Sequence, residues 1–179
     1  MKNKPLLITT LGYPGSGKTY FSERLAKEFN LFHINSDKIR VEMFDNPNFS
    51  PEEHHAVFHF IEWLTQELLK KGVSVIVDAN LNKQVRRDKF AQMAYKTKVD
   101  YILLYLKTPT HIAEDRIIKR RDIKNIEKKK YYRTIDLSVL HNIRKEIEYP
   151  TSKEHFLEID GLKPYSKQVE TFKNWLENK

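Results

Sequence analysis

Eight residues near the beginning of the printed sequence have the types and the spacing that binding of phosphate groups requires. They read Gly12-Tyr13-Pro14-Gly15-Ser16-Gly17-Lys18-Thr19. Glycines allow backbone N–H groups to turn toward a phosphate, and a helix that begins at the end of such a loop favours anions. Lys18 is expected to reach the outer phosphates, and the Thr19 hydroxyl to bind Mg²⁺. The pattern therefore predicts a site for ATP with Mg²⁺.

Two aspartates follow apolar runs and form a second group of candidates. Asp78 ends the run Val75-Ile76-Val77-Asp78, where a rigidly supported carboxylate suits the magnesium side of the site. Asp37, in Asn35-Ser36-Asp37-Lys38-Ile39-Arg40, is placed to accept the proton of an incoming hydroxyl. The alternatives are a turn aspartate at 78 and, at 37, an N-cap of a helix that begins at Lys38, where Ser36 is a second possible cap.

The elements that must position these residues alternate along the chain. Apolar runs rich in β-branched residues predict strands at 5–11, 31–35, 73–78, 101–106 and 156–159. Helical periodicity predicts helices at 18–29, 38–44, 51–71, 82–96, 108–121, 135–148 and 165–178. Ser50-Pro51-Glu52-Glu53 is typical of a helix start. Such alternation indicates an α/β fold with a parallel sheet covered on both faces, whose ligands lie beyond the carboxyl ends of the strands.

Length, composition and charge limit the classes of protein that fit. A chain of 179 residues suits one domain spanning 1–179, and the absence of cysteine excludes disulfides and thiolate metal sites. With no membrane-length apolar stretch, we expect a cytoplasmic protein without membrane contact. The net charge of +8 favours phosphate-rich partners. Nine basic residues against two acids concentrate this charge between Arg116 and Arg133, although a solvated helix and loop would explain the same segment.

Read in order, these motifs resemble the small P-loop kinases, including AAA-type and zeta-like members, and most closely the kinase domain of phage-type polynucleotide kinases. The resemblance runs from the first strand to about Tyr149. It implies a P-loop NTPase three-layer α/β/α sandwich, a five-stranded parallel sheet of order 2-3-1-4-5, and a helical lid at about 112–134. It also implies that Asp37 is the general base and that Arg40, one turn later, contacts the acceptor's phosphate.

The resemblance assigns further residues by position. Asp78-Ala79-Asn80-Leu81-Asn82, followed by Arg86 and Arg87, is similar to the family's Asp-Thr-Asn-Leu-Asn segment and its trailing arginines. The resemblance implies that Asp78, Asn80, Arg86 and Arg87, like Arg40, bind the substrate. One insertion leaves either arginine as the counterpart. Arg116 and Arg120 resemble the lid arginines that clamp the donor phosphates, where they would stabilise charge in the transition state. Their alternative is solvent exposure or pairing with Glu114 and Asp115.

Three functions fit the sequence. The preferred one is a kinase that transfers the γ-phosphate of ATP to the 5′-hydroxyl of RNA or DNA. The second is a kinase of the same fold acting on a small hydroxylated molecule such as an antibiotic, sugar or nucleotide, since the first motifs are shared with antibiotic phosphotransferases, sugar kinases and zeta-type toxins. The third is an ATPase switch that acts through a partner.

The apolar side chains of the 51–71 helix cover more than one face, which indicates core packing or, alternatively, a dimer or acceptor surface.

Overall fold

The computed structural model of the chain describes residues 4–121 and 137–178. A five-stranded sheet runs through its centre, in the order β2-β3-β1-β4-β5. Its strands are β1 (Leu6–Leu11), β2 (Phe32–Asn35), β3 (Val75–Asp78), β4 (Asp100–Lys107) and β5 (Phe156–Asp160). All four neighbouring pairs are parallel. The predicted strand order and the all-parallel arrangement are confirmed.

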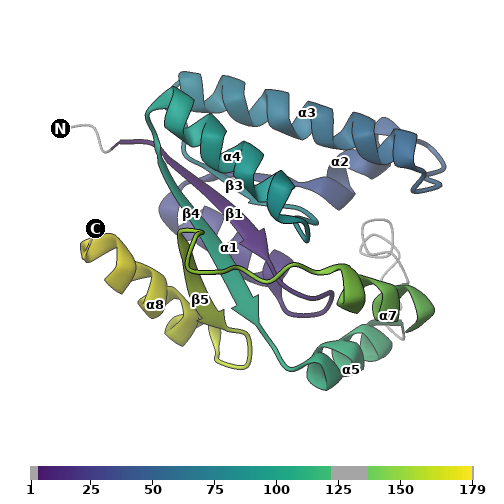
Figure 1. Cartoon of the computed structure of the whole chain (residues 1–179). Helices are drawn as coiled ribbons and strands as arrows, with labels where there is room; N and C mark the ends of the chain where they lie inside the picture. Colours follow the sequence, from purple (N-terminus) through teal and green to yellow (C-terminus); the bar gives the residue numbers. More distant parts are fainter. Residues whose placement is uncertain (1–3, 122–136, 179) are drawn as a thin grey trace.

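Helices cover both faces of this sheet (Figure 1). One face carries α3 (Pro51–Lys70) and α4 (Gln84–Thr97), and the other carries α1 (Lys18–Phe29) and α8 (Tyr165–Glu177). The two faces alternate along β1, because Leu7 packs toward α3 and α4 whereas Leu6 and Ile8 pack toward α1 and α8. The predicted three-layer α/β/α fold is therefore confirmed.

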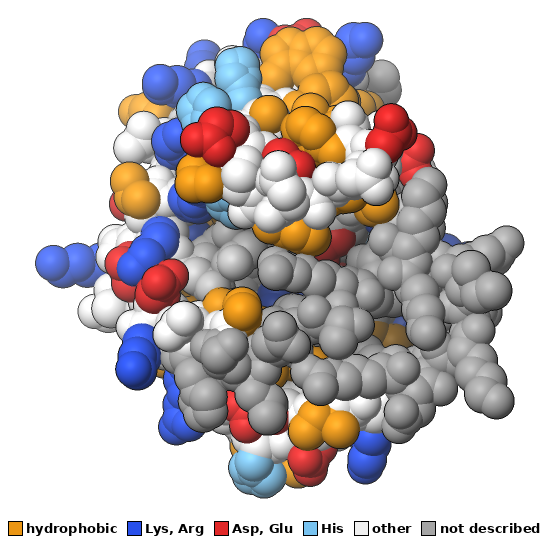
Figure 2. Space-filling model, turned by 90° about the vertical axis from the view of Figure 1, so that its right-hand side faces the viewer, with side chains coloured by type: hydrophobic (Ala, Val, Ile, Leu, Met, Phe, Trp, Pro, Cys, Tyr) orange, Lys and Arg blue, Asp and Glu red, His pale blue; other side chains and the backbone are white. Residues whose placement is uncertain are grey.

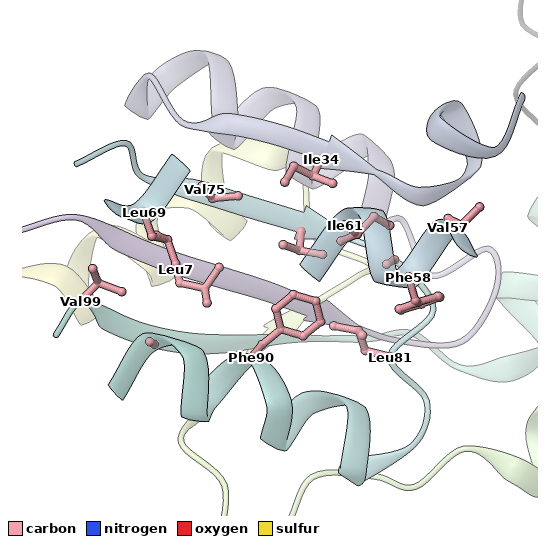
Figure 3. Close-up of a cluster of buried hydrophobic side chains, with 13 residues drawn as sticks. Leu7, Ile34, Val57, Phe58, Ile61, Leu69, Val75, Leu81, Phe90 and Val99 are labelled. Atoms are coloured by element: carbon pink, nitrogen blue, oxygen red, sulfur yellow. The ribbon is translucent and has the colours of Figure 1, made fainter. Parts of the chain in front are cut away.

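The larger hydrophobic core holds α3 and α4 against the sheet, and these helices lie nearest the residues predicted to bind the phosphate acceptor. Phe58 and Ile61 of α3 and Phe90 of α4 are buried against β3 and β1, as Figure 3 shows. By contrast, Phe60 and Trp63 are 38% and 53% exposed on the outside of α3. The apolar residues of this helix thus supply both core packing and an exposed aromatic pair.

Three further helices lie at the carboxyl ends of the strands. α2 (Ser36–Met43) directly follows β2, and α5 (Thr110–Arg121) and α7 (Leu137–Glu146) pack together beyond the ends of β1 and β4 (Figure 1). Most of the predicted lid, and most of the basic segment between Arg116 and Arg133, falls in 122–136 and so lies outside the described residues. Within the described ranges, no helix has the length and apolar character needed to cross a bilayer.

Candidate active site

The phosphate loop joins β1 to α1 and is held in a tight turn. The Ser16 amide donates to the Tyr13 carbonyl at 3.0 Å, and Gly17 stands at the N-cap of α1 in a left-handed conformation. Gly15 has a φ of +81°, and a Cβ atom there would collide with the carbonyl of Ala113 in α5. Glycine is therefore required at this position both by its backbone angle and by the close approach of α5.

Lys18 and Ser16 give this loop the properties of an anion site. Lys18 Nζ lies within the loop and donates to the carbonyls of Gly12 at 2.7 Å and Tyr13 at 3.3 Å. Ser16 Oγ is buried and has no hydrogen-bond partner among the described residues. A cation, an unsatisfied hydroxyl and the N-terminus of α1 together fit the phosphate groups of a nucleotide.

Asp78 lies beside this loop at the end of β3 and is fully buried. The parallel register places it opposite Asn35 of β2, whose side-chain amide donates to Asp78 Oδ2 at 2.7 Å. His33 Nε2 makes a longer contact of 3.5 Å with the same oxygen. Burial by itself raises the pKa of the Asp78 carboxyl, but His33, the Thr19 hydroxyl and the Lys18 charge outweigh it, and the pKa lies below its usual value. Asp78 is therefore a charged carboxylate next to Thr19.

Asp78 and Thr19 are the residues that would hold Mg²⁺. Across residues 4–121 and 137–178, no group of three His, Asp or Glu side chains gathers in a way that could bind a metal ion. One carboxylate and one hydroxyl nevertheless suit Mg²⁺, which keeps several waters and takes further ligands from substrate phosphates. The residues present fit a magnesium ion that arrives with its nucleotide. When bound, such an ion neutralises charge on the transferring phosphate.

Asp37 is exposed in the first turn of α2. The helix begins at Ser36, two residues earlier than expected, and its N-cap is Asn35, whose side-chain oxygen accepts from the Lys38 amide at 2.9 Å. Asn35 thus satisfies the helix end while its amide nitrogen holds Asp78. Because Asn35 performs the capping, the predicted alternative role of Asp37 and Ser36 as N-caps is not what the structure shows.

Arg40 lies one turn further along α2, and its guanidinium is buried. It pairs with Glu53 of α3 at 3.1 Å, lies 3.3 Å from His54 Nδ1 and stacks on Phe49 at 4.8 Å. Glu53 also accepts the backbone amides of residues 48 and 49. The arginine predicted to contact the acceptor's phosphate is therefore already engaged in joining α2 to α3.

The two arginines at the start of α4 have different surroundings. Arg87 is fully buried and forms two hydrogen bonds with Glu154, at 2.6 and 2.8 Å, as well as one with the Leu81 carbonyl. Arg86 is partly exposed, and its guanidinium lies over the Phe58 ring at 4.1 Å. Of the two, Arg86 is the one available to a ligand. Asn80, the other predicted residue of this segment, is exposed and accepts the Asn82 amide at 3.3 Å.

Arg116 of α5 reaches the phosphate loop. It contacts the carbonyls of Gly15 and Ser16 at 3.5 Å and donates to the Gly161 carbonyl at 3.0 Å. A Cβ atom on Gly161 would collide with the Thr108 hydroxyl, so this turn after β5 packs directly against the loop. Among the described residues, the predicted alternative of pairing with Glu114 and Asp115 is not seen, and the other alternative, full solvent exposure, does not fit a half-buried side chain. The side chain of Arg120 lies outside the described part of the structure.

This geometry can be compared with known proteins. The AAA domain family AAA_33 matches residues 7–145, more than half of the chain. The chain belongs to this family. Among curated relatives, this chain is 24% identical to the cytidylate kinase of Methanocaldococcus jannaschii, and the match covers 94% of this chain and 89% of that protein. It is 27% identical to the probable adenylyl-sulfate kinase of Aeropyrum pernix, over 70% and 69%.

Solved structures share the fold of this chain. Kti12 of Chaetomium thermophilum, in complex with ADP-AlF₃, has a TM-score of 0.75 at 17% identity and covers 97% of this chain and 98% of its own. A chain of the Pnkp1/Rnl/Hen1 RNA repair complex has a TM-score of 0.60 at 22% identity, over 83% of this chain and 48% of its own. The chain therefore shares the fold of these proteins.

Several residues that shape the candidate active site were not predicted from the sequence. Asn35 and His33 on β2, Glu53 on α3, and Thr108 and Gly161 around the loop all contact predicted site residues. Tyr13 was expected only as part of the loop, yet its hydroxyl bonds to α5 and α7. These contacts join residues far apart in the chain, so the sequence around each residue does not reveal them. Asn35 did carry a local signal, because asparagine is a favoured N-cap residue.

Proposed function

We propose that this protein is an ATP-dependent kinase that transfers the γ-phosphate to the 5′-hydroxyl of RNA or DNA. The observation that carries the proposal is the position of Asn35, which bonds to buried Asp78 with its amide nitrogen and caps α2 with its oxygen. This arrangement ties an exposed carboxylate, Asp37, to the edge of a nucleotide-binding site. An exposed carboxylate at that position suits a general base.

In the proposed reaction, Asp37 accepts the proton of the acceptor's hydroxyl group while the hydroxyl oxygen forms a bond to the γ-phosphorus of ATP. The bond between that phosphorus and the bridging oxygen breaks, and ADP leaves. Lys18, within the loop, and Arg116, which contacts the loop, would stabilise the charge that develops on the phosphate oxygens. Thr19 and Asp78 would hold Mg²⁺, and Arg120 would add a second lid cation.

The preference for a polynucleotide acceptor rests on the resemblance to the phage-type kinases and on the charge of +8. The second candidate is a kinase that acts on a small phosphorylated molecule. It is favoured by the relatives named as cytidylate kinase and adenylyl-sulfate kinase. An ATPase switch has less support, because it gives exposed Asp37 no role.

Substitution of the proposed base tests this function. Asp37→Asn should lower kcat for phosphate transfer at least about 100-fold, since a general base contributes on that scale. The affinity for ATP should change less than about twofold, because the nucleotide is held by the loop and not by α2. The matched control is Asp45→Asn, an exposed aspartate just beyond α2 that should keep normal turnover. Wild-type turnover in Asp37→Asn would show that the base is another residue.

A further inference from the structure

A groove runs between α3 and α4 on the outer side of the domain, apart from the phosphate loop. It encloses a cavity of about 230 Å³ lined by His55, Phe58, His59, Glu62, Val85, Arg86 and Lys89. Self-contained sites for small molecules usually measure about 300–1,000 Å³. A smaller cavity open to solvent is better suited to one unit of a longer ligand than to a whole small molecule.

The groove is continuous with the predicted acceptor residues through a chain of direct contacts. Arg40 lies 3.3 Å from His54 Nδ1, and the His54 ring lies 4.6 Å from the ring of Phe58. Phe58 in turn lies under the Arg86 guanidinium at 4.1 Å. Burial, together with the charges of Arg86 and Arg40, lowers the pKa of His54 to about 4, which keeps the ring neutral at pH 7. Two intervening side chains therefore connect Arg40 to Arg86.

The charges in the groove favour an anion. The Arg86 guanidinium makes no hydrogen bond or ion pair with any described residue, so its donors are available. Lys89 pairs with Glu62 only loosely, at 3.4 Å and with the lysine largely exposed. An exposed pair of this kind contributes little and is readily exchanged for another anion.

Aromatic side chains accompany these cations. Phe60 and Trp63 lie on the adjoining exposed side of α3, with ring centroids 5.7 Å apart. Figure 2 views the molecule from the side toward which the strands point. At the top of this view, histidine, Lys and Arg side chains gather next to hydrophobic ones. Surfaces that bind single-stranded nucleic acid combine cations, which meet the phosphates, with exposed aromatic rings, on which the bases stack.

We propose that the α3–α4 groove binds the single-stranded acceptor beyond the 3′ phosphate of its 5′-terminal nucleotide, with Arg86 and Lys89 contacting the phosphodiester oxygens that follow. This inference rests on the proposed function and names the part of the acceptor that the groove recognises. It predicts that acceptor length matters: a long strand fills the groove, whereas a single nucleotide bearing a 5′-hydroxyl does not reach it.

The test compares two acceptors, a 5′-hydroxyl octanucleotide (as RNA and as DNA) and a nucleoside 3′-monophosphate. The double variant Arg86→Gln, Lys89→Gln should raise KM for the octanucleotide about tenfold, as expected for lost charge-assisted hydrogen bonds, and leave KM for the nucleotide within about twofold. The salt dependence of octanucleotide KM should also become shallower. The matched control, Lys96→Gln, removes an exposed charge from the same helix outside the groove and should change neither acceptor.

Each remaining outcome has a distinct meaning. An unchanged octanucleotide KM, or an equal rise for both acceptors, would overturn the groove as an extended acceptor site. If the double variant unfolds, Lys89→Gln alone gives the same comparison, because this exposed side chain is not needed for packing. A wild-type protein that phosphorylates neither acceptor would overturn the proposed function itself, and the inference with it.

Discussion

Arg86 and Arg87 show how neighbouring residues of one type divide structural and ligand-binding roles. Consecutive helical residues point about 100° apart, so only one of the two can face the core. Arg87 faces inward and joins α4 to Glu154, 67 residues away, while Arg86 faces the α3–α4 groove. The sequence left both as candidates, because the partner that decides between them comes from a distant segment.

At this scale we expect Arg87 to govern stability. Arg87→Met should lower the free energy of unfolding by about 3–5 kcal/mol, since it leaves the buried Glu154 carboxylate without its partner. Arg86→Met should cost no more than about 1 kcal/mol, the scale of an exposed cation–π contact. Urea unfolding of the two variants measures the difference. Equal losses would contradict the assignment of separate roles.

At the scale of elements, Tyr13 connects the phosphate loop to two helices. Its buried hydroxyl lies 3.0 Å from a Glu114 carboxylate oxygen of α5 and 2.9 Å from the Leu140 carbonyl of α7, and its single proton is shared between these two acceptors. Burial and the Glu114 carboxylate raise the pKa of Tyr13 to about 12, so the hydroxyl keeps its proton at neutral pH and acts as a donor. Glu114 is followed, two residues later on α5, by Arg116, which reaches the loop. Tyr13 is therefore placed to hold Arg116 in position.

Tyr13→Phe should accordingly lower kcat about tenfold, because the shared hydrogen bond that orients α5 and α7 is lost. The apolar packing of the ring against Ala113 and Ile117 would remain. A double-mutant cycle separates positioning from simple destabilisation: in an Arg116→Ala background, the Tyr13→Phe change should have almost no further effect on kcat. The matched control is Tyr95→Phe, at an exposed position on α4. Fully additive losses would show that Tyr13 does not act through Arg116.

Local signals predicted most element boundaries. The helix start at Ser50-Pro51 is confirmed, with the Ser50 side chain accepting from the Glu53 amide. The start of α2 was placed too late, at Lys38, because Ser36 and Asp37 are themselves good caps and neither could be preferred. The register between β2 and β3 decides in favour of Asn35, since this residue is also needed opposite Asp78. That preference depends on a tertiary contact.

At the scale of the whole molecule, alternating elements and one loop motif predicted an α/β fold with a parallel sheet, whereas the strand order was implied by the resemblance to the small P-loop kinases. The motif fixes β1 and α1, and apolar runs that alternate with helices then allow few arrangements of a parallel sheet. The polar contacts that complete the site were not predictable in this way. Asn35 with Asp78 and Arg116 with Gly161 are separated by 43 and 45 residues, and hydrophobic periodicity carries no information about such pairs.

The most direct measurement of function is a competition for labelled phosphate. The protein is incubated with γ-labelled ATP, Mg²⁺ and equal amounts of a 5′-hydroxyl oligonucleotide, cytidylate and adenylyl sulfate, and the products are separated. We predict that label appears on the oligonucleotide and disappears in Asp37→Asn. Label on either small molecule, or label released only as free phosphate, would contradict a polynucleotide acceptor.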